Sequence, residues 1–251
     1  MNAVVAALQT SVDHLQAIVD GLGPDRIRRP AYPSEWTVAD TLSHLGSGAA
    51  IMGRGFEDSL AGHDTDGDFN QSVWDEWNAK SPDDQAADAL MADAALMAAL
   101  NSATDSQLEA FHLAMGPMAL DFATFAGLRL NEHVLHTWDV EVVDDPGAVL
   151  MADAVPFIID AVGLIVGFAG RTPGTDTTVS VRTTEPGLEL AVVMTPDSVA
   201  LTPSLPGSEA DLTLPAEAFI RLVYGRLDPD HTPPGVGGPA VEQLRLVFPG
   251  V

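Results

Sequence analysis

The sequence predicts an α+β protein, with a helical bundle over residues 1–172 followed by a small α+β domain over residues 173–251. Apolar residues recur with the period of an α-helix as far as about residue 169. After residue 175, short segments rich in β-branched residues and separated by turn residues replace that period. With 251 residues, 46% of them hydrophobic, the chain is long enough to bury a core in one large domain or two modest ones.

The first three helices have clear start or stop signals. Apolar residues spaced for one helix face predict a helix over residues 3–21, which Gly23-Pro24 ends. Thr37 can cap a second helix that runs to about residue 60, and Asp40 is placed to complete a capping box. In "SPDDQAADALMADAALMAALNSA", a capping serine, a proline at the first helical position and acidic residues in the first turn predict a third helix.

Two further helices are expected before the change of pattern, over about 118–143 and 149–169. The small domain should then contain the strands "TTVSVRTT", "LELAVVM" and "SVALTPS". The segment "ADLTLPAEAFIRLVYGRL" indicates a strand that leads into a helix, with Pro215 at the helix start. The tail "PAVEQLRLVFPGV" indicates a last helix.

Composition excludes several classes of chemistry and partner. The chain contains no cysteine, which rules out disulfides, thiolate metal sites and a cysteine nucleophile, so that any reactive thiol must come from a cofactor. Lys and Arg total 11 against 36 Asp and Glu, a formal net charge of -25. Because so acidic a surface repels phosphate groups, we expect no nucleic-acid partner and no anionic membrane partner.

Nothing in the sequence indicates export or membrane insertion. The N-terminal segment lacks a basic region and carries Asp13 and Asp20, so no signal peptide is expected. The most apolar run, residues 154–170, is shorter than the roughly 18–20 residues of a span and contains Asp160. A buried helix and a cytoplasmic location are therefore expected.

One stretch, "LRLNEHVLHTWDVEV", places ionisable residues among apolar ones. Glu132 and His136 are four residues apart, so on a helix they point to the same place, as two ligands of one metal do. His44 is the best candidate for a third ligand, because it is expected to face inward from the second helix. Imidazole and carboxylate donors favour zinc, nickel, iron or manganese over calcium, and three protein ligands describe a catalytic site with an open position.

Competing interpretations stay open at this point. His133 lies about 100° around the helix from Glu132 and could replace it as a ligand. Glu132 and His136 could instead form an ordinary polar pair. The stretch "DTDGDFNQSVWD" resembles a calcium loop, but Phe69 occupies the position that needs glycine and Asp75 stands where a glutamate is usual.

Two segments, "SEWTVADTLSHLG" and "NEHVLHTWD", resemble motifs of the mycothiol-dependent maleylpyruvate isomerase family, which is widespread in actinobacteria. That family places W-T-V-x-D-x-x-x-H-L and E-x-x-x-H-x-x-D on a DinB/YfiT-like metal-binding four-helix bundle; residues 36–45 and 132–139 match these patterns. The second domain also resembles the family's C-terminal domain in its strand–helix–"GR" segment, which includes Arg226.

The resemblance implies a divalent metal, usually zinc, held by His44, Glu132 and His136. Its open position would receive the thiol of mycothiol, a cysteine-containing sugar cofactor, and lower the pKa of that thiol. Arg226, at the family's "GR" position, would meet a substrate carboxylate, unless it is an ordinary arginine at a helix end. Asp139 lies one turn after His136 and is expected to orient a ligand or pair with an arginine, or else to be a solvated or capping carboxylate near the helix end.

The implied activity is cis–trans isomerisation of a small electrophile or thiol S-transfer to it. The alternatives are a metal-dependent hydrolase and a non-catalytic binding module on the same fold.

Overall fold

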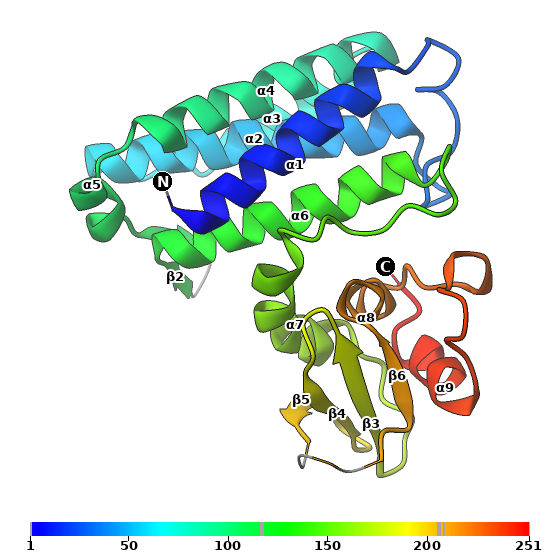
Figure 1. The fold of residues 1–251 in the computed structure, drawn as a ribbon. Helices are drawn as coiled ribbons and strands as arrows, with labels where there is room; N and C mark the ends of the chain where they lie inside the picture. The colour runs from blue at the N-terminus through cyan, green and yellow to red at the C-terminus, as the bar shows by residue number, and fades with distance from the viewer. Residues whose placement is uncertain (1, 116–117, 205–206, 208, 251) are drawn as a thin grey trace. The chain divides into compact units, whose positions relative to one another are not determined.

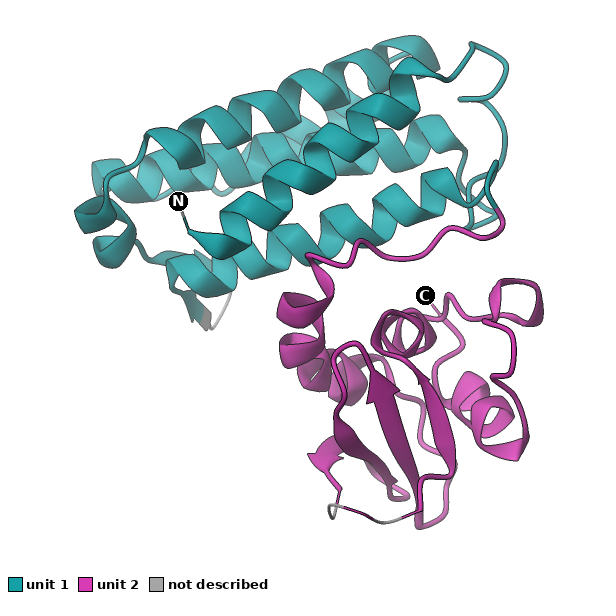
Figure 2. Ribbon diagram, in the orientation of Figure 1, with its two compact units in different colours: residues 1–145 teal, residues 146–251 magenta. Residues whose placement is uncertain are grey.

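The computed structural model describes residues 2–115, 118–204, 207 and 209–250. The chain folds as two compact units, residues 1–145 and residues 146–251 (Figure 2). The first is helical apart from one short hairpin, and the second combines helices with a four-stranded sheet. The α+β class predicted from the sequence is therefore confirmed.

The first unit is built on the long helices α1 (Ala3–Asp20), α2 (Val38–Ala61), α4 (Pro82–Ser102) and α6 (Phe122–Glu141). These helices lie lengthwise beside one another (Figure 1). In this bundle α2 packs against α4 and α6, and α1 packs against α6 and α4, while the short α3 lies against α2. The helices of the unit are α1 (Ala3–Asp20), α2 (Val38–Ala61), α3 (Phe69–Asn78), α4 (Pro82–Ser102), α5 (Asp105–Ala110) and α6 (Phe122–Glu141).

Local hydrogen bonds fix the helix starts that the sequence predicted. The Thr37 side chain accepts from the Asp40 backbone, and the Asp40 carboxylate accepts in return from the Thr37 backbone at 2.9 Å, which is a complete capping box. Ser81 caps α4 and Pro82 is its first residue. Because Thr37 starts α2 at a defined residue, the position of His44 two turns later is defined as well.

Two packed regions hold the bundle together. Around Leu42 and Leu45 of α2, apolar side chains from α1, α3, α4 and α6 form one buried cluster. Gly46 allows α2 and α4 to approach closely, since a Cβ atom there would collide with the ring of Trp77 and lie 2.8 Å from the Cα of Ala89. Four phenylalanine rings pack together toward the other end: Phe56, Phe111, Phe122 and Phe125.

The second unit contains a sheet with strand order β5-β4-β3-β6. Strands β3, β4 and β5 pair antiparallel, whereas β6 pairs parallel to β3. The elements of this unit are α7 (Val155–Ala169), β3 (Thr177–Thr184), β4 (Glu189–Met194), β5 (Val199–Pro203), β6 (Leu212–Pro215), α8 (Ala216–Val223), the 3-10 helix η1 (Pro229–His231) and α9 (Pro239–Val247).

The structure differs from the sequence-based expectations at four places. The expected boundary lay between residues 172 and 173, but α7 packs against α8 and β5 and therefore groups with the second unit. The expected helix from residue 118 begins at Phe122, because Met118–Leu120 forms strand β2 and pairs with β1 (Leu113–Met115). The helices α3 and α5 were not expected. No helix of the described residues is both long and apolar enough to cross a membrane.

Candidate metal centre

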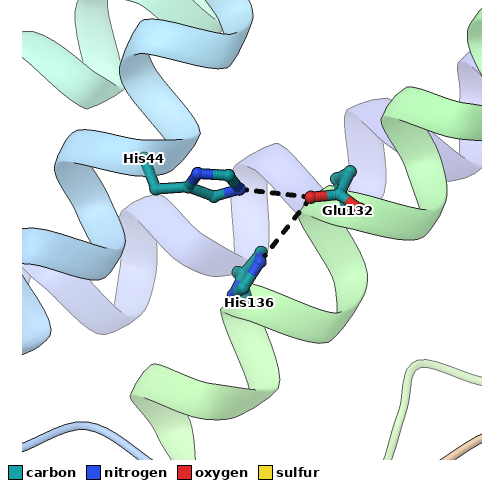
Figure 3. A group of neighbouring side chains, drawn as sticks. All are labelled: His44, Glu132 and His136. Carbon is teal, nitrogen blue, oxygen red and sulfur yellow. Dashed lines mark hydrogen bonds and ion pairs between the residues drawn. The ribbon is translucent and has the colours of Figure 1, made fainter. Parts of the chain in front are cut away.

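Three of the predicted site residues come together at one point of the first unit (Figure 3). The Glu132 Oε2 atom lies 3.1 Å from His44 Nε2 and 3.6 Å from His136 Nε2. Glu132 and His136 project from consecutive turns of α6, and His44 reaches them from α2. Residues far apart in the sequence therefore present two imidazoles and one carboxylate to a single point.

The spacing of these donor atoms suits a small divalent cation. Ligand atoms at about 2.1 Å from a tetrahedral metal lie about 3.4 Å from one another. The two distances from Glu132 Oε2 to the imidazole nitrogens, 3.1 and 3.6 Å, lie on either side of that value, and all three ligand atoms lie within 4.8 Å of one another. Among the described residues, this is the one His, Asp and Glu group that could hold a metal.

The group is more exposed than the sequence suggested. The side chains of His44 and Glu132 are 42% and 49% exposed, whereas that of His136 is 13% exposed. The expectation that His44 faces inward is therefore wrong. Its neighbours Ser43 and Leu45 are buried, and His44 lies at the edge of that buried stripe. The exposure leaves one side of the group open to a ligand from solvent.

The carboxylate of Asp139 lies within hydrogen-bond distance of the His136 ring. The Nδ1 atom of His136 lies 2.8 Å from Oδ2 of Asp139, whose side chain is fully buried. A proton on Nδ1 then donates to the carboxylate and leaves the Nε2 lone pair directed toward Glu132. The structure thus places Asp139 beside a candidate ligand, and its role in orienting that ligand stays a prediction.

The two histidines also set the charge of Glu132. Partial desolvation of the carboxylate raises its pKa, but hydrogen bonds and charge from His136 and His44 outweigh that effect and lower the pKa below its ordinary value. Glu132 is therefore an anion at neutral pH. A negative ligand beside two imidazoles is the donor set of several catalytic zinc sites.

His133 lies on a different face of α6 and is bound within the core. Its Nδ1 is 2.7 Å from Ser11 Oγ, and its Nε2 is 3.2 Å from Asp93 Oδ2. The ring is completely buried, and both of its nitrogens have partners inside the bundle. This placement favours Glu132 over His133 as the candidate ligand that accompanies His136 on α6.

The buried partners of His133 were not identified from the sequence. Asp93 of α4 forms an ion pair with Arg129 of α6, and Arg129 Nη2 also donates to the Leu45 carbonyl at 3.0 Å. Desolvation raises the pKa of Asp93, but the charges and hydrogen bonds of Arg129 and His133 together outweigh it and hold that pKa below the ordinary value. Desolvation lowers the pKa of His133, so the ring is neutral, with Nε2–H donating to Asp93 and Nδ1 accepting from Ser11.

A signal for this network was present in the sequence. Asp93 is four residues after Ala89 and three before Leu96, so it falls within the buried stripe of an alanine-rich helix. Arg129 and His133 are likewise four residues apart among the apolar residues of α6. Charges of opposite sign within two buried stripes indicate a buried pair.

Two further predicted positions, Arg226 and the calcium-like stretch "DTDGDFNQSVWD", are not part of the His44, Glu132 and His136 group. Arg226 lies in the second unit after α8, is 7% exposed, and its Nη1 donates to the Tyr224 carbonyl at 3.0 Å. Its expected contact with a substrate carboxylate stays a prediction. In the calcium-like stretch, the last seven residues belong to helix α3, and among the described residues no three His, Asp or Glu side chains there bring ligand atoms within 4.8 Å of one another.

Comparison with known proteins adds a family to this geometry. The sequence profile of the "Mycothiol maleylpyruvate isomerase N-terminal domain" matches residues 8–141, which is more than half of the chain and includes all three candidate ligands. No curated protein sequence matches the chain.

Two solved crystal structures share the fold, namely a mycothiol-dependent maleylpyruvate isomerase at 14% identity and a histidine-to-alanine variant of it at 13%. Each alignment covers 94% of both chains with a TM-score of 0.65, so the likeness of fold extends over nearly the whole chain. From the profile match, the chain belongs to the mycothiol maleylpyruvate isomerase N-terminal domain family.

Proposed function

We propose that this protein is a metal-dependent enzyme that uses mycothiol to act on a small electrophile, by cis–trans isomerisation of the maleylpyruvate type or by thiol S-transfer. The observation that carries the proposal is the convergence of His44, Glu132 and His136 with one side open to solvent. Family membership supports the choice of mycothiol. The absence of cysteine agrees with a thiol supplied from outside the chain.

Each residue of the centre has a role that its surroundings support. His44 and His136 would provide neutral nitrogen donors, and Glu132 an anionic oxygen donor. When bound, a divalent metal such as zinc lowers the pKa of a thiol that ligates it, which provides thiolate at neutral pH. Asp139 would keep the proton of His136 on Nδ1, away from the ligating nitrogen.

Arg226 would bind a carboxylate of the substrate. An arginine suits this role because its guanidinium offers a planar pair of donors. Cations are scarce in a chain with a net charge of -25, so binding of an anionic substrate would depend strongly on each arginine that contacts it.

Metal analysis and a thiol titration together test the proposal. Protein purified without added metal should contain about one divalent ion per chain, and His44→Ala and His136→Ala should each remove it. His14→Ala is the matched control, because His14 pairs with Glu141 in the same bundle and is not part of the centre. Wild-type protein without metal, or variants that retain it, would refute the assignment of the ligands.

The cobalt-substituted protein then separates the thiol enzyme from its alternatives. Titration with mycothiol should produce a near-ultraviolet charge-transfer band, and turnover of maleylpyruvate should require the thiol. A metal-containing protein that shows neither result would instead be a hydrolase or a binding module, and these two differ in whether the protein hydrolyses ester or amide substrates.

A further inference from the structure

The two candidate histidine ligands are held in place by different means. His136 is only 13% exposed and its Nδ1 is bonded to the buried carboxylate of Asp139. His44 is 42% exposed, and the one side-chain hydrogen bond that it makes with the described residues joins its Nε2 to Glu132. Its Nδ1 therefore has no protein group comparable to Asp139 to fix the ring.

An aromatic contact takes the place of that hydrogen bond at His44. The ring centroid of Trp36 lies 5.3 Å from that of His44, with the planes at 49°. The same indole lies 5.9 Å from the His136 ring, nearly parallel at 22°, and the two imidazoles are 4.6 Å apart. Trp36 therefore packs against both imidazoles, on which the geometry of the centre depends.

The backbone around Trp36 gives the indole a defined position. Trp36 donates its backbone N–H to the Pro33 carbonyl, and its own carbonyl accepts from Ala31, each at 2.8 Å. The next residue, Thr37, is the N-cap of α2, the helix that carries His44. A tight turn that leads directly into the ligand-bearing helix thus holds the ring, although Trp36 is itself 37% exposed.

We infer that Trp36 is a positioning residue, which keeps the His44 imidazole in its ligating orientation by ring packing. This inference rests on the proposed metal centre. Offset and edge-to-face aromatic pairs have a preferred geometry, so the indole restricts rotation of an imidazole whose hydrogen bond to Glu132 involves one ring nitrogen alone. The indole does for His44 what the carboxylate of Asp139 does for His136.

Cobalt affinity tests the inference in a series of variants. Trp36→Ala should weaken Co²⁺ binding about 3- to 10-fold, the range that the energy of one aromatic pair gives. Trp36→Phe should restore most of the affinity because it retains a ring, whereas Trp36→Leu should not. The matched control is Trp74→Ala, which removes an exposed indole from α3 of the same bundle and should bind cobalt as the wild type does.

A second measurement uses the metal-free protein. Ring protons of His44, assigned by comparison with His44→Ala, should show a ring-current shift in the NMR spectrum that Trp36→Ala removes. Unchanged cobalt affinity and unchanged His44 resonances in Trp36→Ala, with the wild type binding cobalt, would overturn the inference and leave the proposed function standing. A wild type that binds no cobalt would overturn both.

Discussion

Removal of the Asp93 side chain should destabilise the first unit strongly, because Asp93 forms an ion pair in the interior of the bundle. Its side chain is 1% exposed and that of its partner Arg129 is 3% exposed, so the ion pair is buried on both sides. Without the carboxylate, the Arg129 cation would still donate to the carbonyl of Leu45 but would lose its anionic partner. His133 would lose the acceptor of its Nε2 proton as well.

The size of the effect follows from this burial. Breaking a buried pair by removing one partner costs about 3–5 kcal/mol of unfolding free energy, because the remaining charge stays in a medium of low dielectric constant. For a chain of this size, about 2–4 °C of melting temperature correspond to each kcal/mol. Asp93→Ala should therefore lower the melting temperature by about 6–20 °C, as followed by circular dichroism.

Two further variants isolate the buried charge as the cause. The double variant Asp93→Leu with Arg129→Met removes both charges and should recover most of the lost stability. Asp83→Ala removes the exposed carboxylate that pairs with Arg28 and should change the melting temperature little, because solvent screens that pair. Equal melting temperatures for Asp93→Ala and Asp83→Ala, or no recovery in the double variant, would refute this account of the network.

Three other predictions concern neighbouring features of the bundle. Asp139→Asn should weaken zinc or cobalt binding about 10- to 100-fold in chelator competition, because the His136 ring loses its carboxylate partner. Gly46→Ala should lower the urea midpoint through collision with the Trp77 ring, while Gly53→Ala, where a Cβ atom would meet only one side-chain carbon at 3.9 Å, should not. Burial lowers the pKa of His133 below 6.5, so as pH falls below 6.5 the unfolded chain takes up a proton first. Unfolding free energy should then fall by up to about 1.4 kcal/mol per pH unit, and His133→Gln should remove this share in urea titrations at several pH values.

Local rules predicted the parts of the fold that depend on neighbouring residues. Thr37 with Asp40, and Ser81 with Pro82, start their helices where the sequence indicated, because a cap is satisfied by backbone groups two or three residues away. The spacing of Glu132 and His136 is likewise a property of one helix, so their convergence could be predicted without a tertiary structure.

Features that depend on distant packing were not predictable in the same way. The exposure of His44 follows from how α2 lies against α4 and α6. Its apolar neighbours in the sequence wrongly predicted that His44 would face the interior. Helix α7 is apolar enough to belong to either unit, and its contacts with α8 and β5, far along the chain, determine its place. The role of Ser11 also needed coordinates, since 122 residues separate it from His133.

The arrangement of α6 explains why a buried network and an exposed centre occur within two turns. Arg129 and His133 form one pair at a spacing of four, and Glu132 and His136 form another that is displaced along the helix. Successive residues turn by about 100°, so the two pairs leave the helix on different faces. Because Ser11 of α1 and Asp93 of α4 bind His133, they restrict rotation of α6 about its axis. That restriction directs Glu132 and His136 toward α2. The capping box at Thr37 fixes where α2 begins and so defines the position of His44 along that helix. The polar interior thus contributes to the geometry of the candidate centre.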